Sequence, residues 1–118
     1  MVKLESVSKM FGDFLAVDNL SMDVAEGEFL TLLGPSGCGK TTTLRLIAGF
    51  EQPTSGNVYI GNKMVNDVPP YRRDVNTVFQ NYALFPHLTV YENIAFGLRL
   101  RRLDPSTIDE RVRWALKL

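Results

Sequence analysis

Hydrophobic and polar residues alternate along the first part of the chain, and this alternation predicts β-structure. Residues 2–8 place their apolar side chains nearly on one parity, and the segment 16–24 has apolar residues at positions 16, 20, 22 and 24. A period of two is typical of half-exposed strands. The run 29–33 is apolar on both parities, which instead indicates a strand covered on both faces of a parallel sheet.

A helix and a hairpin are predicted in the middle of the chain. The helix includes residues 42–48 and is followed by Gly49, a residue that favours a helix end. Its expected apolar face consists of Leu44, Ile47 and Ala48. A Gly-Asn pair at 61–62 predicts a two-residue turn between strands at 57–60 and 63–65.

A second buried strand is predicted after a break in the chain. Two consecutive prolines at 69–70 interrupt any regular element. The charged residues 72–74 follow and are expected to be solvated. Residues 75–79 then predict a strand that places Gln80 at its end.

Two helices are predicted in the last third of the chain from their start signals. Thr89 and Glu92 have the spacing of a capping box. Asp104 precedes Pro105, which is the order expected for an N-cap and a first-turn proline. The expected buried faces are Val90, Ile94 and Leu98 in the first helix, and Ile108, Val112, Ala115 and Leu116 in the second.

Composition and charge narrow the classes of function. The length of 118 residues suits one domain. Basic and acidic residues balance at 13 each, so no net charge draws the chain to nucleic acid. The sequence shows no transmembrane run and no signal peptide, and its single cysteine excludes an internal disulfide. We therefore expect a chain that is made and kept in the cytosol and binds no nucleic acid.

Residues 34–41 match the phosphate-loop pattern G-x-x-x-x-G-K-[ST] between a predicted strand and a predicted helix. Glycines let the backbone bring N–H groups close to anionic oxygens, and the helix N-terminus adds the positive end of its dipole. Lys40 is expected to reach the β and γ phosphates of ATP, and the Thr41 hydroxyl to coordinate Mg²⁺. The predicted nucleotide contacts in this segment are Gly34, Pro35, Ser36, Gly37, Cys38, Gly39, Lys40, Thr41 and Thr42.

Other readings of this segment fit less well. A glycine-rich turn without a ligand explains neither the lysine nor the strand and helix on its two sides. A dinucleotide fingerprint requires a small residue where Thr42 stands. Cys38 lies beside a helix N-terminus and Lys40, an environment that lowers a thiol pKa, although a small filler is the simpler role for it.

Three spaced motifs resemble the ATP-binding subunits of ABC transporters. They are Phe11 before the phosphate loop, the loop itself, and residues 78–87 after it. The continuation through 92–98 resembles the importer branch. Within that branch, two segments look most like spermidine and putrescine importers, namely 27–33 and 73–80, whereas 66–70 also looks like sugar importers.

The resemblance implies an α/β fold of the P-loop NTPase class, with an antiparallel β subdomain and the start of a parallel core sheet with helices. It implies that residues 1–118 are the N-terminal portion of a single ATP-binding domain, truncated before the signature and second acidic motifs. Such a chain should be largely inactive alone, since a Mg²⁺-holding carboxylate and a water-positioning group are missing.

The resemblance also implies site residues and partners. Phe11 would stack on the purine with Ala16 near it, and Gln80 would sense the γ phosphate, Mg²⁺ or the attacking water, acting with Lys40 in catalysis. The implied partners are ATP, a second ATP-binding subunit in a homodimer of the full-length protein, and transmembrane permease subunits. Core packing explains most aromatic residues of the segment 82–96, near which the resemblance places a permease contact.

Two functions remain open. The chain is either part of a transport ATPase, with polyamines as the favoured substrate and sugars as the alternative, or a nucleotide-binding module without useful hydrolysis. A small P-loop kinase or GTPase would need a guanine-selecting motif or lid arginines, which the sequence does not show.

Overall fold

An antiparallel sheet forms the framework of the N-terminal part of the chain. The computed structural model describes residues 1–118. Its strands are β1 (Val2–Phe11), β2 (Phe14–Val24), β3 (Ser55–Ile60) and β4 (Lys63–Met64), in the spatial order β2-β1-β3-β4. Every pairing is antiparallel. The predicted turn at 61–62 is confirmed, because Ile60 pairs with Lys63 across it.

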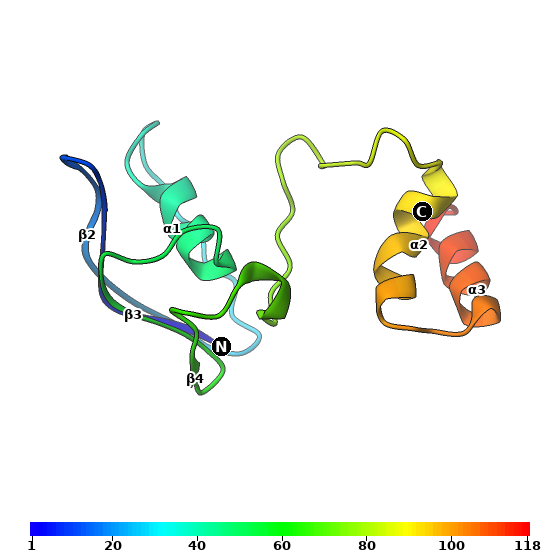
Figure 1. Ribbon diagram of the computed structural model, residues 1–118, viewed down its shortest axis with the longest axis horizontal. Coiled ribbons are helices and arrows are strands. Elements are labelled where there is room, and N and C mark those ends of the chain that lie inside the picture. Colours follow the sequence, from blue (N-terminus) through cyan, green and yellow to red (C-terminus); the bar gives the residue numbers. More distant parts are fainter. The chain divides into compact units, whose positions relative to one another are not determined.

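Helix α1 (Lys40–Ala48) covers one face of this sheet (Figure 1). Each buried aliphatic side chain between them contributes about 1.5–3 kcal/mol by leaving water. The buried core consists of Leu4, Val7, Val17, Leu46, Val58 and Val65. Packing against the sheet therefore contributes to the position of the residues that precede the helix.

The predicted apolar face of α1 is partly wrong. Leu44 is 55% exposed, whereas Thr43 and Leu46 are buried. Thr43 can be buried because its hydroxyl donates a hydrogen bond to the carbonyl oxygen of Gly39 at 2.9 Å. The hydroxyl is thus satisfied inside the helix, and the face toward the sheet shifts by one residue.

Arg73 is buried, which corrects the expectation that residues 72–74 are solvated. It follows the short 3₁₀ helix η1 (Pro70–Arg72). Its guanidinium donates to the carbonyl oxygens of Leu46 at 2.7 Å, Ile47 at 3.0 Å and Val68 at 2.7 Å. The guanidinium therefore satisfies carbonyl groups at the C-terminal end of α1, where a positive charge is favoured by the helix dipole.

The two runs predicted as parallel strands do not form strands in the structure. Residues 29–33 and 75–79 belong to no ladder, and Phe29 and Leu33 are 92% and 87% exposed. An apolar run becomes a strand only when a neighbour accepts and donates its backbone hydrogen bonds. No segment of residues 1–118 supplies that neighbour.

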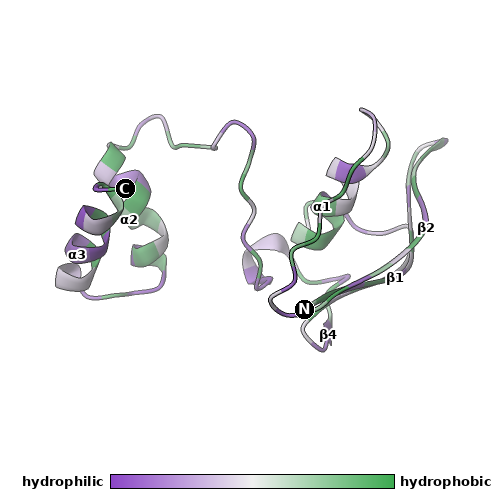
Figure 2. Cartoon of the chain, turned by 180° about the vertical axis from the view of Figure 1, so that it is seen from behind, coloured by the Kyte–Doolittle hydropathy of each residue, from purple (hydrophilic) through white to green (hydrophobic).

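Helices α2 (Val90–Leu100) and α3 (Pro105–Ala115) pack against each other through a small core. Both predicted start signals are confirmed: Thr89 and Glu92 form a complete capping box, and Asp104 accepts from the N–H of Thr107 at 2.9 Å. Figure 2 shows α2 as the more hydrophobic of the two. The buried residues are Ala95, Ile108 and Val112. Val90 and Leu116, predicted to be buried, are exposed.

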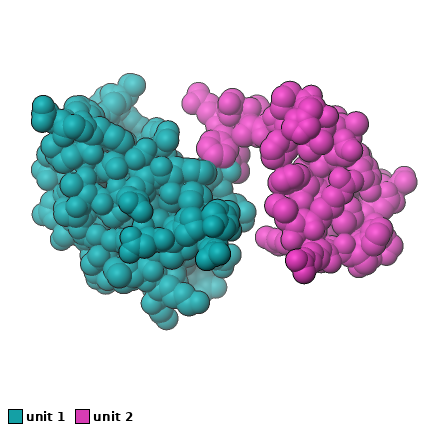
Figure 3. Space-filling view, in the orientation of Figure 1, with its two compact units in different colours: residues 1–77 teal, residues 78–118 magenta.

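The chain divides into two compact units, Met1–Thr77 and Val78–Leu118 (Figure 3). The sheet, α1 and the phosphate loop belong to the N-terminal unit, and α2 and α3 to the C-terminal unit. No helix in either unit combines the length and the hydrophobicity that crossing a membrane requires.

We predict that Arg73→Met destabilises the N-terminal unit, because it leaves buried carbonyl groups without donors. A loss of at least about 2 kcal/mol in the free energy of unfolding is expected, since hydrogen bonds to charged groups are worth about 1.5–3 kcal/mol each. Urea unfolding followed by circular dichroism measures it. The control is Arg72→Met, which removes an exposed arginine at the neighbouring position. Equal stability of the two variants would show that the guanidinium does not hold the end of α1.

Candidate functional site

The segment 34–41 forms a loop that runs directly into helix α1. The helix begins at Lys40, and Gly39 precedes it in the left-handed conformation with a φ of +90°. A Cβ atom at Gly39 would collide with the carbonyl oxygen of Ala16 in strand β2. Only glycine lets the loop approach β2 this closely. The structure thus brings together two residues, Gly39 and Ala16, that the sequence analysis placed at the site for different reasons.

The ammonium group of Lys40 lies against the loop. It donates hydrogen bonds to the carbonyl oxygens of Gly34 at 2.6 Å and Pro35 at 2.7 Å. It also donates to Sγ of Cys38 at 3.2 Å. An anion that approaches the loop therefore meets a full positive charge whose position is already fixed by three acceptors.

The same lysine changes the acidity of the exposed thiol of Cys38. The hydrogen bond from Lys40 lowers the pKa of this thiol, and a small burial effect opposes the shift. The direction agrees with the expectation from the sequence. Because the thiolate is the nucleophilic form, we expect a larger thiolate fraction for Cys38 at neutral pH than for an ordinary cysteine.

The first turn of α1 offers backbone donors that no side-chain cap uses. Gly39 provides no side-chain cap, and the first turn contains no acidic residue. The first N–H groups of a helix lack acceptors within the helix and carry the positive end of its dipole. The hydroxyl groups of Thr41 and Thr42 lie in the same turn. Donors and hydroxyls are thus concentrated where an anion can use them.

A hollow of about 370 Å³ opens beside this turn. Its lining comprises Phe14, Ala16, Ser36, Gly37, Gly39, Lys40, Thr41 and Thr42. A neighbouring hollow of about 470 Å³ adds Cys38 and Thr43 and shares Phe14, Ala16 and Gly37 with the first. Apart from Phe14, every residue that lines the first hollow was predicted from the sequence to contact a nucleotide.

Phe14 was missed by the sequence analysis. Its Cα pairs with that of Phe11 at the end of the β1–β2 hairpin. The signal that could have found it is a second aromatic residue placed across the predicted turn from Phe11, which was itself expected to stack on the base.

Phe11 lies at the end of β1, where Nζ of Lys9 is 4.8 Å from its ring centroid. Gln80 belongs to the C-terminal unit and is exposed. The predicted roles of Phe11 and Gln80 rest on the resemblance.

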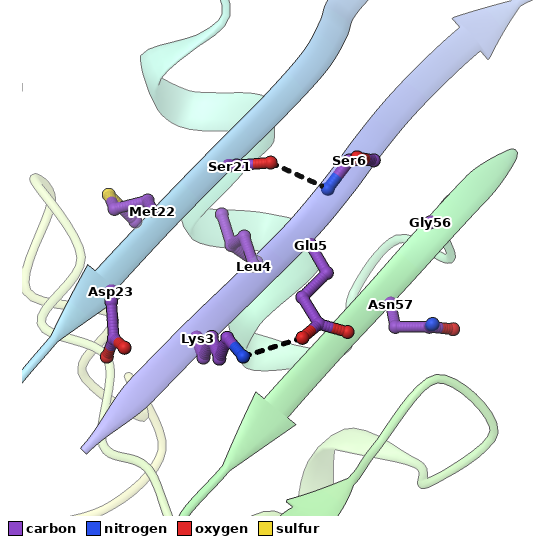
Figure 4. A pocket seen from close by; sticks show the side chains of 9 residues that line it. All are labelled: Lys3, Leu4, Glu5, Ser6, Ser21, Met22, Asp23, Gly56 and Asn57. Carbon is purple, nitrogen blue, oxygen red and sulfur yellow. Dashed lines mark hydrogen bonds and ion pairs between the residues drawn. The ribbon is translucent and has the colours of Figure 1, made fainter.

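A larger hollow lies away from the loop. It has a volume of about 740 Å³, lies on the sheet and includes residues of β1, β2 and β3 (Figure 4). Two of its charged groups, Lys3 and Glu5, form an ion pair with each other at 2.6 Å, and Ser21 accepts from the N–H of Ser6 at 2.9 Å. A wide surface whose lysine is already paired with a carboxylate is a weaker candidate for an anion site than a smaller hollow beside an uncapped helix N-terminus.

The ABC transporter family matches residues 17–118 of this sequence. The chain belongs to this family. Similar proteins include the spermidine/putrescine import ATP-binding protein PotA of Rubrobacter xylanophilus, 62% identical over 99% of this chain and 31% of that protein. The PotA protein of Acetivibrio thermocellus is 57% identical over 99% of this chain and 33% of that protein. The chain therefore spans about a third of the length of the curated relatives that it matches.

Solved structures of ABC transporter cassettes have the same fold. The dimeric post-hydrolysis structure of the ATP-binding cassette MJ0796, bound to ADP and Pi, is 35% identical with a TM-score of 0.85. It is matched over 99% of this chain and 56% of that chain. A dimeric structure of the same bacterial cassette gives a TM-score of 0.83. The predicted fold class, the N-terminal part of an ABC ATP-binding domain, is confirmed.

The aromatic segment of this ABC family member is only partly packed. The rings of Phe85 and Phe96 lie 4.6 Å apart, and the hydroxyl of Tyr91 donates to Asp109 at 3.3 Å. Tyr82 is 78% exposed. Core packing therefore accounts for part of the segment 82–96 and leaves other rings at the surface.

We predict that Lys40→Met raises the pKa of Cys38 toward the ordinary thiol value of about 8.5. In the unsubstituted chain the rate of alkylation by iodoacetamide should reach half its maximum below that pH, because the lysine favours the thiolate. The midpoint should move upward in Lys40→Met. Mass spectrometry across a pH series measures both profiles. Lys63→Met removes a lysine from β4 and serves as control; the same midpoint in all three proteins would contradict the contact.

Proposed function

We propose that this chain binds ATP through residues 34–42 and strand β2. The observation that carries the proposal is the hollow of about 370 Å³, where Lys40 and the uncapped first turn of α1 meet Ala16. Backbone donors, a helix dipole and one lysine suit the terminal phosphates of a nucleotide. The solved cassette bound to ADP and Pi is a relative with this fold, which supports the same ligand class here.

The residues at the loop also suit Mg²⁺. Thr41 lies in the first turn of α1, beside Lys40, and lines the hollow. Mg²⁺ prefers oxygen ligands and keeps several waters, so it needs few protein groups besides the phosphate oxygens. One hydroxyl is therefore an adequate protein ligand. We assign this role to Thr41, and Gln80 is the second ligand that the resemblance suggests.

For the whole protein we propose ATP hydrolysis that powers import, with polyamines as the substrate class. Relatives that are 57–62% identical are named spermidine/putrescine import ATP-binding proteins. Residues 1–118 would be the N-terminal portion of one ATP-binding domain, since they correspond to about a third of those relatives. The exposed apolar run 29–33 supports this, because it has the character of a strand that requires neighbours.

The proposed partners follow from the same relatives. The solved cassettes are dimeric, which supports a second ATP-binding subunit, and an import function requires transmembrane permease subunits. Contact with the permease would place the protein at the cytoplasmic face of the membrane. Lys40 would neutralise phosphate charge, and Gln80 would link the nucleotide to the permease.

The second candidate is a nucleotide-binding module without useful hydrolysis. It is favoured by one observation: residues 1–118 contain no group of three or more histidine, cysteine, aspartate or glutamate residues able to hold a metal ion. In this case Mg²⁺ would depend on Thr41 and the phosphates, with no carboxylate to fix it for phosphoryl transfer.

We predict that Lys40→Ala abolishes ATP binding, whereas Gln80→Ala spares binding and lowers turnover in the whole protein. Lys40 is the only full positive charge that lines the hollow, so its removal should lower the affinity for ATP by far more than tenfold, that is, by more than about 1.4 kcal/mol. Equilibrium titration with a fluorescent ATP analogue and phosphate release measure the two effects.

Lys63→Ala controls for the loss of a lysine elsewhere in the N-terminal unit. Normal ATP binding by Lys40→Ala would refute the proposed site, and normal turnover by Gln80→Ala would refute the role given to Gln80. ATP binding without turnover by residues 1–118, beside turnover by the whole protein, would establish the second candidate for this segment.

A further inference from the structure

The aromatic ring of Phe14 lies beside the phosphate loop without belonging to it. Phe14 is the first residue of β2, and its Cα pairs with that of Phe11 across a two-residue turn. It lines the hollow that Lys40 and Thr41 border, and also the neighbouring hollow that Cys38 borders. The Phe14 ring therefore lines both the hollow bordered by Lys40 and the hollow bordered by Cys38.

Phe14 is 61% exposed, and no ring contact or cation–π contact holds it within the chain. A phenyl ring offers phosphate oxygens no hydrogen bond and no charge. It offers a base a flat apolar face on which stacking is favourable for any purine or pyrimidine. An apolar wall next to an anion cradle thus suits a ligand with one charged end and one aromatic end.

Phe11 has a different environment. Nζ of Lys9 lies 4.8 Å from the centroid of its ring. Lys9 is in turn held by the carboxylate of Glu51 at 3.2 Å and by the carbonyl oxygen of Gln52 at 2.8 Å. One contact of the Phe11 ring is therefore already made by a fixed cation. Phe11 lines neither of the two hollows beside the loop, whereas Phe14 lines both.

We infer that Phe14 contacts the base of the nucleotide whose phosphates the loop binds, and that it makes the site prefer a nucleoside triphosphate to inorganic tripolyphosphate. This inference rests on the proposed function, because it requires a nucleotide at residues 34–42. It extends the expectation that Phe11 receives the base with Ala16 near it: the base-facing surface also includes Phe14, the residue opposite Phe11 in the hairpin.

Binding of Mg-ATP and of Mg-tripolyphosphate to the full chain, measured by isothermal titration calorimetry, tests the inference. Phe14→Ala should weaken Mg-ATP binding about 5- to 150-fold, the range expected for one stacked base, and should change tripolyphosphate binding less than about twofold. Tyr71→Ala is the matched control, since Tyr71 is an exposed aromatic residue that borders neither hollow. It should leave both affinities unchanged.

A second variant, which keeps an aromatic side chain at position 14, tests the inference even if Phe14→Ala folds poorly. Phe14→Trp in a Trp114→Phe background should retain ATP affinity, and its fluorescence should change on addition of Mg-ATP but not of Mg-tripolyphosphate. An equal response to both ligands, or an equal loss of both affinities in Phe14→Ala, would overturn the base contact. If the unsubstituted chain binds neither ligand, the proposed function fails; if it binds both equally well, the inference about Phe14 fails and the phosphate site remains.

Discussion

One ammonium group holds the phosphate loop closed on itself. The carbonyl oxygens of Gly34 and Pro35 and the sulfur of Cys38 converge on Nζ of Lys40. Acceptors brought this close repel one another unless a donor lies between them, so the position of the ammonium determines the curvature of the loop. Because Lys40 is also the first residue of α1, the loop closes at the helix end that carries the positive dipole.

The helix that carries this loop is held at both ends. At its start, Gly39 lies against Ala16 of β2, a contact that a side chain would prevent. At its end, Arg73 donates to the carbonyl oxygens of Leu46 and Ile47, and Gly49 leaves room for the guanidinium. A binding site works best when its donors are placed before the ligand arrives. The sheet and the arginine together provide that placement.

The features that the sequence predicted correctly depend on neighbours in the chain. The start of α1 directly after a glycine-rich loop, the Thr89 capping box and the Asp104 cap each involve residues within about one or two helical turns of one another, so the local sequence is sufficient to predict them. Burial of Arg73 depends on carbonyl groups 26 and 27 residues away, and the position of Phe14 at the loop depends on how the hairpin packs. The strand expected at 29–33 failed for a similar reason, because a strand needs a partner that its own residues do not specify.

The most direct test of this account is an NMR titration of the ¹⁵N-labelled chain with Mg-ATP. The account predicts that the backbone amide signals of residues 36–42 shift most, and that the Lys40 ammonium signals shift as Nζ exchanges the oxygens of Gly34 and Pro35 for phosphate oxygens. Shifts concentrated on the sheet hollow around Lys3 and Asn57, with the loop amides unchanged, would contradict it.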